Sequence, residues 1–250
     1  MNKTTQLIIL LAILGLWACR ENKTRIVYED NDTIVQPNHS NDSESELNKM
    51  IAAELPFTFD NLEHLYFAVG ETDESNRLKV KSFSGSYSRT SNSHSHGYFN
   101  GRKLDCDIEN LLIKLQGDTT YKLLTNNVIK IKTMTYLYSF DTLYGKDRII
   151  YKIIDSDTNK DTFLNDEDLL GLYISKTNGD DFKRISPQNH QLLDWKMIVS
   201  QGLLYFRTIE DINRNGEFDK HDRHNLYEYN MIKEDTIKLI FNDKVYSKLK

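Results

Sequence analysis

Cysteine is nearly absent from this chain: its 250 residues include two Cys, alongside three Pro and 11 Gly. Cys19 lies at the end of an N-terminal stretch that resembles a secretion signal, so Cys106 is the one other thiol. If Cys19 is modified, the mature chain has no internal disulfide even when it is exported. A disulfide-stabilised fold is therefore excluded, and the domain must be stabilised by its core and by any ions that it binds.

Signatures of several functions are also missing. The sequence contains no Gly-rich phosphate-binding loop and no Ser, His and Asp pattern with a nucleophile elbow. Its 37 acidic residues outnumber 32 basic ones, for a net charge of −5, so nucleic-acid binding has no electrostatic support. Asp105 and Asp107 flank Cys106 and would raise the pKa of its thiol, so a small structural residue is predicted there rather than a nucleophile.

Residues 1–18 have the pattern of a secretory signal. Lys3 precedes an apolar run from Leu7 to Ala18, which is short for a membrane span. The run ends in Leu16-Trp17-Ala18-Cys19, which resembles a bacterial lipobox, in which the Cys is lipidated and becomes the first mature residue. The alternative is an uncleaved anchor with an incidental Cys. We predict lipidation at Cys19 and attachment to a bacterial membrane of the cell envelope, with the outer membrane favoured.

Residues 19–56 are predicted to form a tether with one short helix. The stretch from Arg20 to about Ser45 is polar and is typical of a linker. Ser43 and Glu46 then form a capping-box pattern, and Pro56 stops the apolar periodicity that follows. The spacing predicts a helix near 44–54.

The stretch from Asp211 to Asp222 carries the most specific functional motif in the sequence. Its oxygen-bearing side chains fall at positions 1, 3, 5, 9 and 12, which is the ligand spacing of an EF-hand-type calcium loop, and Gly216 suits the sharp turn at position 6. Asp219, at position 9, would bind directly or through water. The predicted ligands are the side chains of Asp211, Asn213, Asn215, Asp219 and Asp222 and the carbonyl oxygen of Glu217.

A second copy of this spacing begins at Asp157, 54 residues upstream (211 − 157). Thr162 replaces the glycine at position 6, a departure from the EF-hand pattern. The predicted ligands are the side chains of Asp157, Asn159, Asp161, Asn165 and Asp168 and the carbonyl oxygen of Phe163.

Crowding of carboxylates supports a bound cation. Six acidic residues lie between Asp155 and Asp168, with Lys160 as the one base. Two such charges about 4 Å apart repel by about 4 kcal/mol at an effective dielectric constant near 20. Calcium suits these hard oxygen donors, and no Cys or His stands beside them at a spacing that suggests zinc. The alternative is an Asn- and Asp-rich hairpin turn without an ion.

Both loops end in Asp at position 12 and place an apolar residue, Leu164 or Phe218, at position 8. This version resembles the calcium loops of dockerin-type modules more closely than those of calmodulin-type sensors. The stretches before the loops, 149–154 and 203–209, are predicted strands rather than helices. A regulatory opening of paired helices is therefore not expected.

The 54-residue offset extends beyond the loops. Ile150-Tyr151 aligns with Leu204-Tyr205, and Leu172-Tyr173 aligns with Leu226-Tyr227. We therefore expect Tyr151 and Tyr205, like Tyr173 and Tyr227, to occupy matching places in successive sheets. Each copy supplies about four short strands in up-and-down order, near the period of a propeller blade.

The phrase Leu172-Tyr173-Ile174-Ser175, a Gly-Asp turn and the run 182–187 resemble the strand-turn-strand phrase of TolB-like propellers. An earlier copy, with a Ser-, Gly- and His-rich insertion through Ser82–Asp107 in place of a calcium loop, makes three recognisable units. The resemblance implies an all-β fold for residues 57–250: a propeller-like array of about three to four four-stranded antiparallel blades.

Within the insertion, His94 and His96 would share one face of a strand, and Asp105 or Asp107 could join them in a transition-metal site. The alternative is a mobile Ser- and Gly-rich loop.

Together these features predict a lipid-anchored, calcium-binding module of the cell envelope that binds or scaffolds and is not an enzyme. Its partner would be an envelope protein or a glycan, with no role for nucleic acid. The alternative is an exported hydrolase that acts on glycan or peptide, which would require a cleft with convergent carboxylates or His away from the calcium loops.

Overall fold

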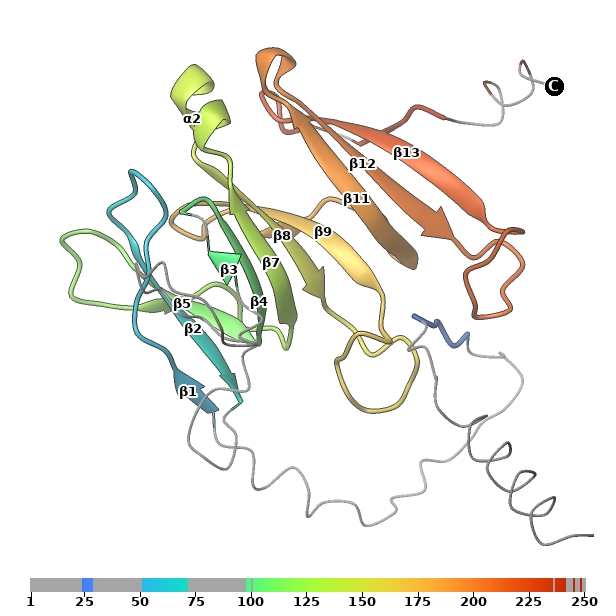
Figure 1. Cartoon of the computed structure of the whole chain (residues 1–250), viewed down its shortest axis with the longest axis horizontal. Helices are drawn as coiled ribbons and strands as arrows, with labels where there is room; N and C mark the ends of the chain where they lie inside the picture. The colour runs from blue at the N-terminus through green and yellow to red at the C-terminus, as the bar shows by residue number, and fades with distance from the viewer. Residues whose placement is uncertain are drawn as a thin grey trace, which may run out of the picture.

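The computed structural model describes residues 24–28, 51–71, 98–99, 101–235 and 237–241, together with Val245 and Lys248. In this part of the chain the protein is mostly β-structure, as expected, and forms three antiparallel sheets of four, six and four strands. Figure 1 shows the sheets side by side, with the six-stranded sheet in the middle. The predicted signal, Cys19, His94 and His96 lie outside the described residues.

The strands follow one another in a simple order. The first sheet has the order β1-β2-β5-β6, the middle sheet β10-β9-β8-β7-β4-β3, and the third sheet β11-β12-β13-β14. The strands of the first sheet are β1 (Ile51–Ala53), β2 (Leu65–Glu71), β5 (Asn110–Lys114) and β6 (Lys122–Leu123). The middle sheet contains β3 (Tyr98–Phe99), β4 (Lys103–Ile108), β7 (Lys130–Tyr136), β8 (Arg148–Ile154), β9 (Leu170–Lys176) and β10 (Lys183–Arg184). The third sheet contains β11 (His190–Ile198), β12 (Leu203–Glu210), β13 (Arg223–Asn230) and β14 (Lys238–Leu239).

Among the described residues, two short helical segments connect strands. Helix α2 (Tyr138–Tyr144) joins β7 to β8, and the 3-10 helix η2 (Val199–Gln201) joins β11 to β12. Each ends at a glycine in the left-handed conformation, Gly145 or Gly202, which a residue without Cβ adopts at little cost. Among the described residues, no helix is long and apolar enough to cross a membrane.

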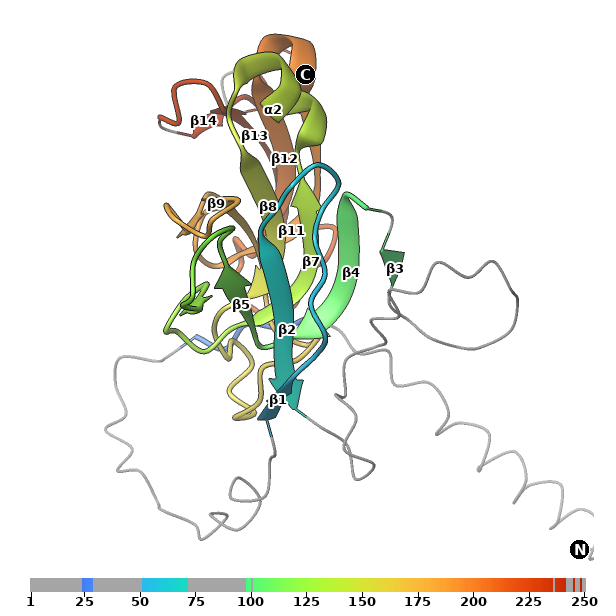
Figure 2. The same ribbon diagram turned by 90° about the vertical axis from the view of Figure 1, so that its left-hand side faces the viewer.

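The consecutive pairing of strands is interrupted at one place, by β3 and β4. β7 to β10 and β11 to β14 each pair in consecutive order, and the first sheet does the same once β3 and β4 are left out. Between β2 and β5 the chain leaves the first sheet, and β4 pairs with β7 of the middle sheet, with Leu104 opposite Met134. Figure 2 shows β4 beside β7, with β3 beyond it. The end of the insertion predicted through Ser82–Asp107 is therefore a strand of the middle sheet.

The middle sheet is buried on both faces. β2 alternates between buried and partly exposed residues, as one packed face requires, whereas most residues of β8 and β9 are buried. One core lies between the first and middle sheets and includes Tyr66, Ile113 and Tyr151. A second core lies between the middle and third sheets. Its buried members are Leu137, Phe140, Ile150, Leu172, Ile174, Ile185, Leu192, Leu204, Phe206, Tyr227, Tyr229 and Met231.

The cross-strand register agrees with the predicted repeat for one tyrosine pair. Tyr173 lies opposite Tyr151 in the middle sheet, and Tyr227 lies opposite Phe206 in the third. All four side chains are buried. Tyr173 and Tyr227 therefore occupy matching places.

The predicted equivalence of Tyr151 and Tyr205 is wrong by one residue. Tyr205 lies opposite Glu228, and its hydroxyl donates a hydrogen bond of 2.8 Å to that carboxylate. The reason is one extra residue in the first copy, because five residues separate Tyr151 from Asp157, whereas four separate Phe206 from Asp211. Since side chains alternate between the faces of a strand, a shift of one residue moves the aromatic ring from Tyr205 to Phe206.

The prediction of a helix near 44–54 is wrong for residues 51–53, which form a strand. Ile51–Ala53 forms β1 and pairs with β2, with Ala52 opposite Gly70. The open edge of β2 offers backbone hydrogen-bonding groups, and pairing with them outweighs a short helical pattern, because propensity is a weak term against tertiary contacts. Residues 44–50 lie outside the described part of the chain.

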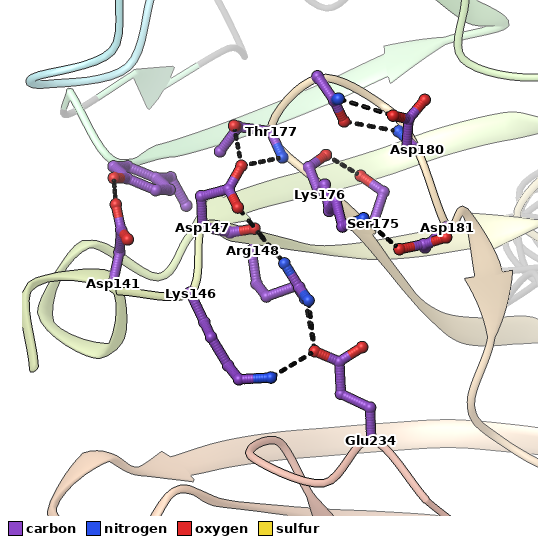
Figure 3. A network of polar contacts seen from close by, with 12 residues as sticks. Asp141, Lys146, Asp147, Arg148, Ser175, Lys176, Thr177, Asp180, Asp181 and Glu234 are labelled. Carbon is purple, nitrogen blue, oxygen red and sulfur yellow. Dashed lines mark hydrogen bonds and ion pairs between the residues drawn. The ribbon is translucent and has the colours of Figure 1, made fainter. Parts of the chain in front are cut away.

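A polar network joins the middle sheet to the third (Figure 3). Arg148, at the start of β8, is 6% exposed and donates from Nε to Oε1 of Glu234 at 3.0 Å. Lys146 approaches the same carboxylate oxygen at 3.6 Å, and Asp147 accepts a hydrogen bond of 3.1 Å from the Thr177 amide. Glu234 follows β13, so this charged contact fixes the third sheet against the middle one at the end that carries α2.

Candidate metal centres in two acidic loops

The two acidic loops occupy equivalent positions in the fold. The first loop, residues 157–168, lies between β8 and β9, and the second loop, residues 211–222, lies between β12 and β13. Figure 1 shows both at the end of the sheets opposite α2, in yellow and in orange. Each loop is closed by a pair of antiparallel strands, which end at Ile154 opposite Leu170 and at Glu210 opposite Arg223.

In the second loop, the predicted ligand side chains hold the turn through backbone amides. The oxygens at positions 1, 3, 5 and 9 each accept one amide hydrogen bond, and position 12 accepts two. The bonds are Gly216 N to Asp211 Oδ2 (2.8 Å), Asn215 N to Asn213 Oδ1 (2.9 Å), Glu217 N to Asn215 Oδ1 (2.9 Å), His221 N to Asp219 Oδ1 (2.7 Å), Ile212 N to Asp222 Oδ1 (3.2 Å) and Asp219 N to Asp222 Oδ2 (2.8 Å).

The first loop repeats these six hydrogen bonds, with acceptors at the same five positions. The bonds are Thr162 N to Asp157 Oδ2 (2.8 Å), Asp161 N to Asn159 Oδ1 (3.0 Å), Phe163 N to Asp161 Oδ1 (2.8 Å), Glu167 N to Asn165 Oδ1 (2.7 Å), Thr158 N to Asp168 Oδ1 (2.6 Å) and Asn165 N to Asp168 Oδ2 (3.0 Å). Two segments of different sequence therefore fold into one turn because Asp and Asn stand at the same positions.

The backbone conformations also match. Position 4 is left-handed in both loops, at Lys160 (φ 59°) and Arg214 (φ 56°), and so is position 6, at Thr162 (φ 72°) and Gly216 (φ 81°). Glycine adopts this conformation at little cost, whereas a β-branched residue is strained in it. Thr162 therefore adopts the glycine conformation, and the surrounding hydrogen bonds must offset its strain.

In the first loop, side chains at three predicted ligand positions contact one another. Asn159 and Asn165 each donate from Nδ2 to Oδ2 of Asp161, at 3.1 and 3.0 Å. The Phe163 amide makes the largest contribution to lowering the pKa of the Asp161 carboxyl group, and these two amides add to it. Positions 3, 5 and 9 thus meet at one carboxylate.

The second loop contains a buried oxygen without a partner. Asp211 is 5% exposed, and its Oδ1 atom is buried and accepts no hydrogen bond. Leaving a buried charged acceptor unsatisfied is costly, about 1–3 kcal/mol or more. Asp157, its counterpart at position 1 of the first loop, accepts amide hydrogen bonds on both oxygens, from Asp161 at 3.1 Å and from Thr162 at 2.8 Å. A cation at position 1 of the second loop would satisfy the free oxygen of Asp211.

The donor atoms in both loops are oxygens, which suit calcium or magnesium better than zinc or copper. Across the described residues, however, no three Asp, Glu, His or Cys side chains lie together as a formed metal-binding group. The loops are ordered turns that carry the correct donors at the correct positions, and calcium binding stays a prediction.

An N-terminal segment that was predicted to be part of a tether joins the two loops. This bridging segment, Thr24–Tyr28, lies within the predicted tether, but its backbone bonds to both loops. The bonds are Arg25 N to Glu167 O (2.8 Å), Val27 N to Thr158 O (2.7 Å), Thr158 Oγ1 to Arg25 O (2.9 Å) and Ile26 N to Gly216 O (3.2 Å). The one signal in the sequence was the apolar group Ile26-Val27-Tyr28 within a polar stretch.

The bridging segment packs closely on the second loop. Ile26 is 6% exposed, and a Cβ added to Gly216 would lie 2.6 Å from its carbonyl oxygen. The Tyr28 hydroxyl donates to the Asp211 carbonyl oxygen at 3.4 Å, and the Arg214 guanidinium lies 5.7 Å from the centre of the Tyr28 ring. Burial, and next the charge of Asp211, raise the pKa of Tyr28 to about 12. Gly216 is thus required by the bridging segment as well as by the turn.

Cys106 and Lys132 make structural contacts. Cys106 is buried, and its thiol donates to the Ile131 carbonyl oxygen at 3.4 Å. Burial raises the pKa of the thiol, and the charges of Asp107 and Asp105 add to this, as predicted for a residue that is not a nucleophile. Lys132 lies 3.1 Å from Asp107 and 2.7 Å from Asp166, and so connects β7 to the first loop.

A small pocket of about 140 Å³ lies at the other end of the domain, near α2. Tyr136 contributes to its wall and donates from its hydroxyl to Asp141 at 2.6 Å, and the guanidinium of Arg102 stacks 4.2 Å above the Tyr138 ring. The residues that line it are Arg102, Tyr136, Leu137, Tyr138, Ser139, Phe140, Met197 and Val199. They include neither a carboxylate nor a His, so this pocket does not offer the pair of groups that a glycosidase needs.

Comparison of the chain with protein-family models, with curated proteins and with solved structures finds no match. The proposals that follow therefore depend on the residues of this chain alone.

Proposed function

We propose that this protein is a lipid-anchored, calcium-binding module of the bacterial cell envelope, with a propeller-like array of sheets, that binds or scaffolds an envelope protein or a glycan. The two loops bind calcium as structural ions, and Cys19 carries the lipid. The observation that carries the proposal is the repeat of six hydrogen bonds in two loops, one of which leaves a buried carboxylate oxygen of Asp211 without a donor.

The propeller-like description is supported by strand order and packing. Each of the three units is a four-stranded meander, and each neighbouring pair of sheets packs face to face around one core. Successive blades of a propeller have this relation. The place of β4 at the edge of β7 differs from a regular blade, so we propose an open array of three blades.

Calcium in these loops stabilises rather than switches. Both loops lie between strands of a packed sheet, so no helix pair is available to open. Extracytoplasmic calcium modules bind with dissociation constants of about 10⁻⁴ to 10⁻³ M, and about 1 mM calcium would then add roughly 0.4 to 1.4 kcal/mol per site. The sites need not be tight, because free calcium outside the cytoplasm can reach these concentrations.

Thermal unfolding of the full chain in chelator and in millimolar calcium tests the proposal. We expect calcium to raise the melting temperature, and we expect Asp211→Asn and Asp157→Asn each to remove the share of one loop, about 1 kcal/mol. The matched control is Asp118→Asn, since Asp118 is an exposed acid in the turn between β5 and β6. A wild-type melting temperature that does not respond to calcium would show that the loops are turns without an ion.

The binding role is tested separately by affinity capture from envelope extracts with calcium and with chelator. A protein or glycan that is retained with calcium, and lost from the Asp211→Asn variant, would be the expected partner. The lipid anchor is tested by Cys19→Ser, which should move the protein out of the membrane fraction; unchanged mass and fractionation would contradict it.

A further inference from the structure

We propose that the end of the domain formed by the two loops and the bridging segment is a membrane-contact surface, and that it takes the anionic face of a phospholipid bilayer. The proposal rests on the calcium and lipid sites proposed above, and names the partner of that same end of the molecule. This contact would set the orientation of the domain relative to the membrane, which neither the calcium sites nor the lipid on Cys19 sets alone.

Exposed apolar side chains lie on all three segments of this surface. Phe163 in the first loop is 53% exposed, Ile212 in the second loop is 48% exposed, and Val27 in the bridging segment is 46% exposed. Single exposed apolar residues are common, but these three belong to segments that hydrogen-bond to one another. Apolar side chains among polar and charged loops are suited to the interface between headgroups and acyl chains.

The chain also ties this end to the membrane. Thr24 follows Cys19 by five residues (24 − 19), so even a fully extended chain spans at most about 18 Å between them. Without the bonds of the bridging segment, the first fixed residue would be near Ile51, 32 residues from Cys19 (51 − 19), and the domain could face any direction. Because the bridging segment is bonded to both loops, the loops are held beside the lipid.

Charge makes this contact dependent on calcium. The carboxylates of Asp157, Asp211 and Asp222 would be repelled by phosphatidylglycerol headgroups in the absence of a cation. Each loop would supply six oxygen ligands, the lower end of the six to eight that calcium takes, so a headgroup phosphate oxygen would be accepted as a further ligand. The surface therefore combines a cation, apolar side chains and a nearby lipid anchor.

Tryptophan quenching by brominated lipids tests this surface in the full, lipidated chain. The variants Phe163→Trp and Ile212→Trp each place a reporter on an exposed apolar position, and Leu143→Trp is the matched control. Leu143 is 58% exposed and lies on α2, at the opposite end of β8 from the first loop. Each variant is reconstituted in vesicles of phosphatidylethanolamine and phosphatidylglycerol with brominated acyl chains, and the signal of the unsubstituted chain is subtracted.

We expect quenching at positions 163 and 212 in calcium to exceed that at position 143 severalfold, and to fall to the level of position 143 in chelator. Equal quenching at all three positions in calcium overturns the membrane-contact surface. Thermal unfolding of the same samples separates the two proposals: a melting temperature that responds to calcium without selective quenching overturns the surface and leaves the calcium sites standing. A melting temperature that does not respond to calcium overturns the calcium sites, and selective quenching that persists in chelator overturns the calcium dependence of the contact.

Discussion

The first and second loops share one hydrogen-bond pattern but satisfy their carboxylates differently. In the first loop both oxygens of Asp157 at position 1 accept amide hydrogen bonds, and Asn159 and Asn165 share the carboxylate of Asp161. In the second loop the buried Oδ1 of Asp211 has no donor. The first loop can therefore hold its shape through its own side chains and bears strain at position 6, whereas the second is unstrained there and has a free oxygen.

The largest difference should appear when the carboxylate at position 12 is removed. Asp168 is 1% exposed and accepts hydrogen bonds from the amides of Thr158 and Asn165, so Asp168→Ala leaves two part-buried amide donors without an acceptor. We expect a loss of about 3 kcal/mol in chelator, against about 1 kcal/mol for Asp222→Ala, whose carboxylate is partly exposed. Urea unfolding of the two variants measures both losses of stability. Equal losses would mean that both loops depend on the carboxylate at position 12 to the same extent.

A Cβ at position 6 of the second loop should have the next largest effect. In Gly216→Ala the new atom would lie 2.6 Å from the Ile26 carbonyl oxygen, and the residue would be held at φ 81°. We expect a loss of about 2 kcal/mol, because strain and the displacement of the bridging segment add. Proteolysis at Arg25 should accelerate at the same time. An intact bridging segment in this variant would show that the close contact is easily relieved.

The smallest effect is expected at the same position of the first loop. Thr162→Gly relieves the left-handed strain but increases the freedom of the unfolded chain, so the two terms nearly cancel. We expect a change of stability within about 1 kcal/mol, in the stabilising direction. Chemical denaturation decides the sign, and a clear loss would mean that the Thr162 side chain has a role that its φ angle does not reveal.

The sequence predicted the parts of this molecule that depend on local spacing. Asp and Asn at positions 1, 3, 5, 9 and 12 were sufficient to indicate two equivalent turns, because each side chain bonds an amide a few residues away. Alternating apolar residues likewise predicted the β-structure. The equivalence of Tyr151 and Tyr205 failed because a strand register depends on every residue between two paired positions, and the first copy has one residue more than the second between its buried aromatic side chain and its loop.

Features that depend on distant partners could not be predicted. Ile51–Ala53 had a helical pattern but paired with the open edge of β2, and β4 paired with β7 although β5 and β6 of the first sheet lie between them in the sequence. The bridging segment bonds to carbonyl groups of residues more than a hundred positions away, such as Glu167. Every residue has a backbone carbonyl group, so the sequence does not indicate which of them accepts a hydrogen bond. The contribution of the bridging segment to the candidate site therefore became visible only in the fold.

The pairing of β4 with β7 limits where a further sheet can be added to this array by duplication. A further four-stranded unit placed after β14 would leave the pairing of every existing strand unchanged. A unit inserted between the first and middle sheets would have to separate β4 from β7 and break the pairing of Leu104 with Met134. Gene duplication can therefore extend this architecture at its C-terminal side, while the first two sheets must be inherited together.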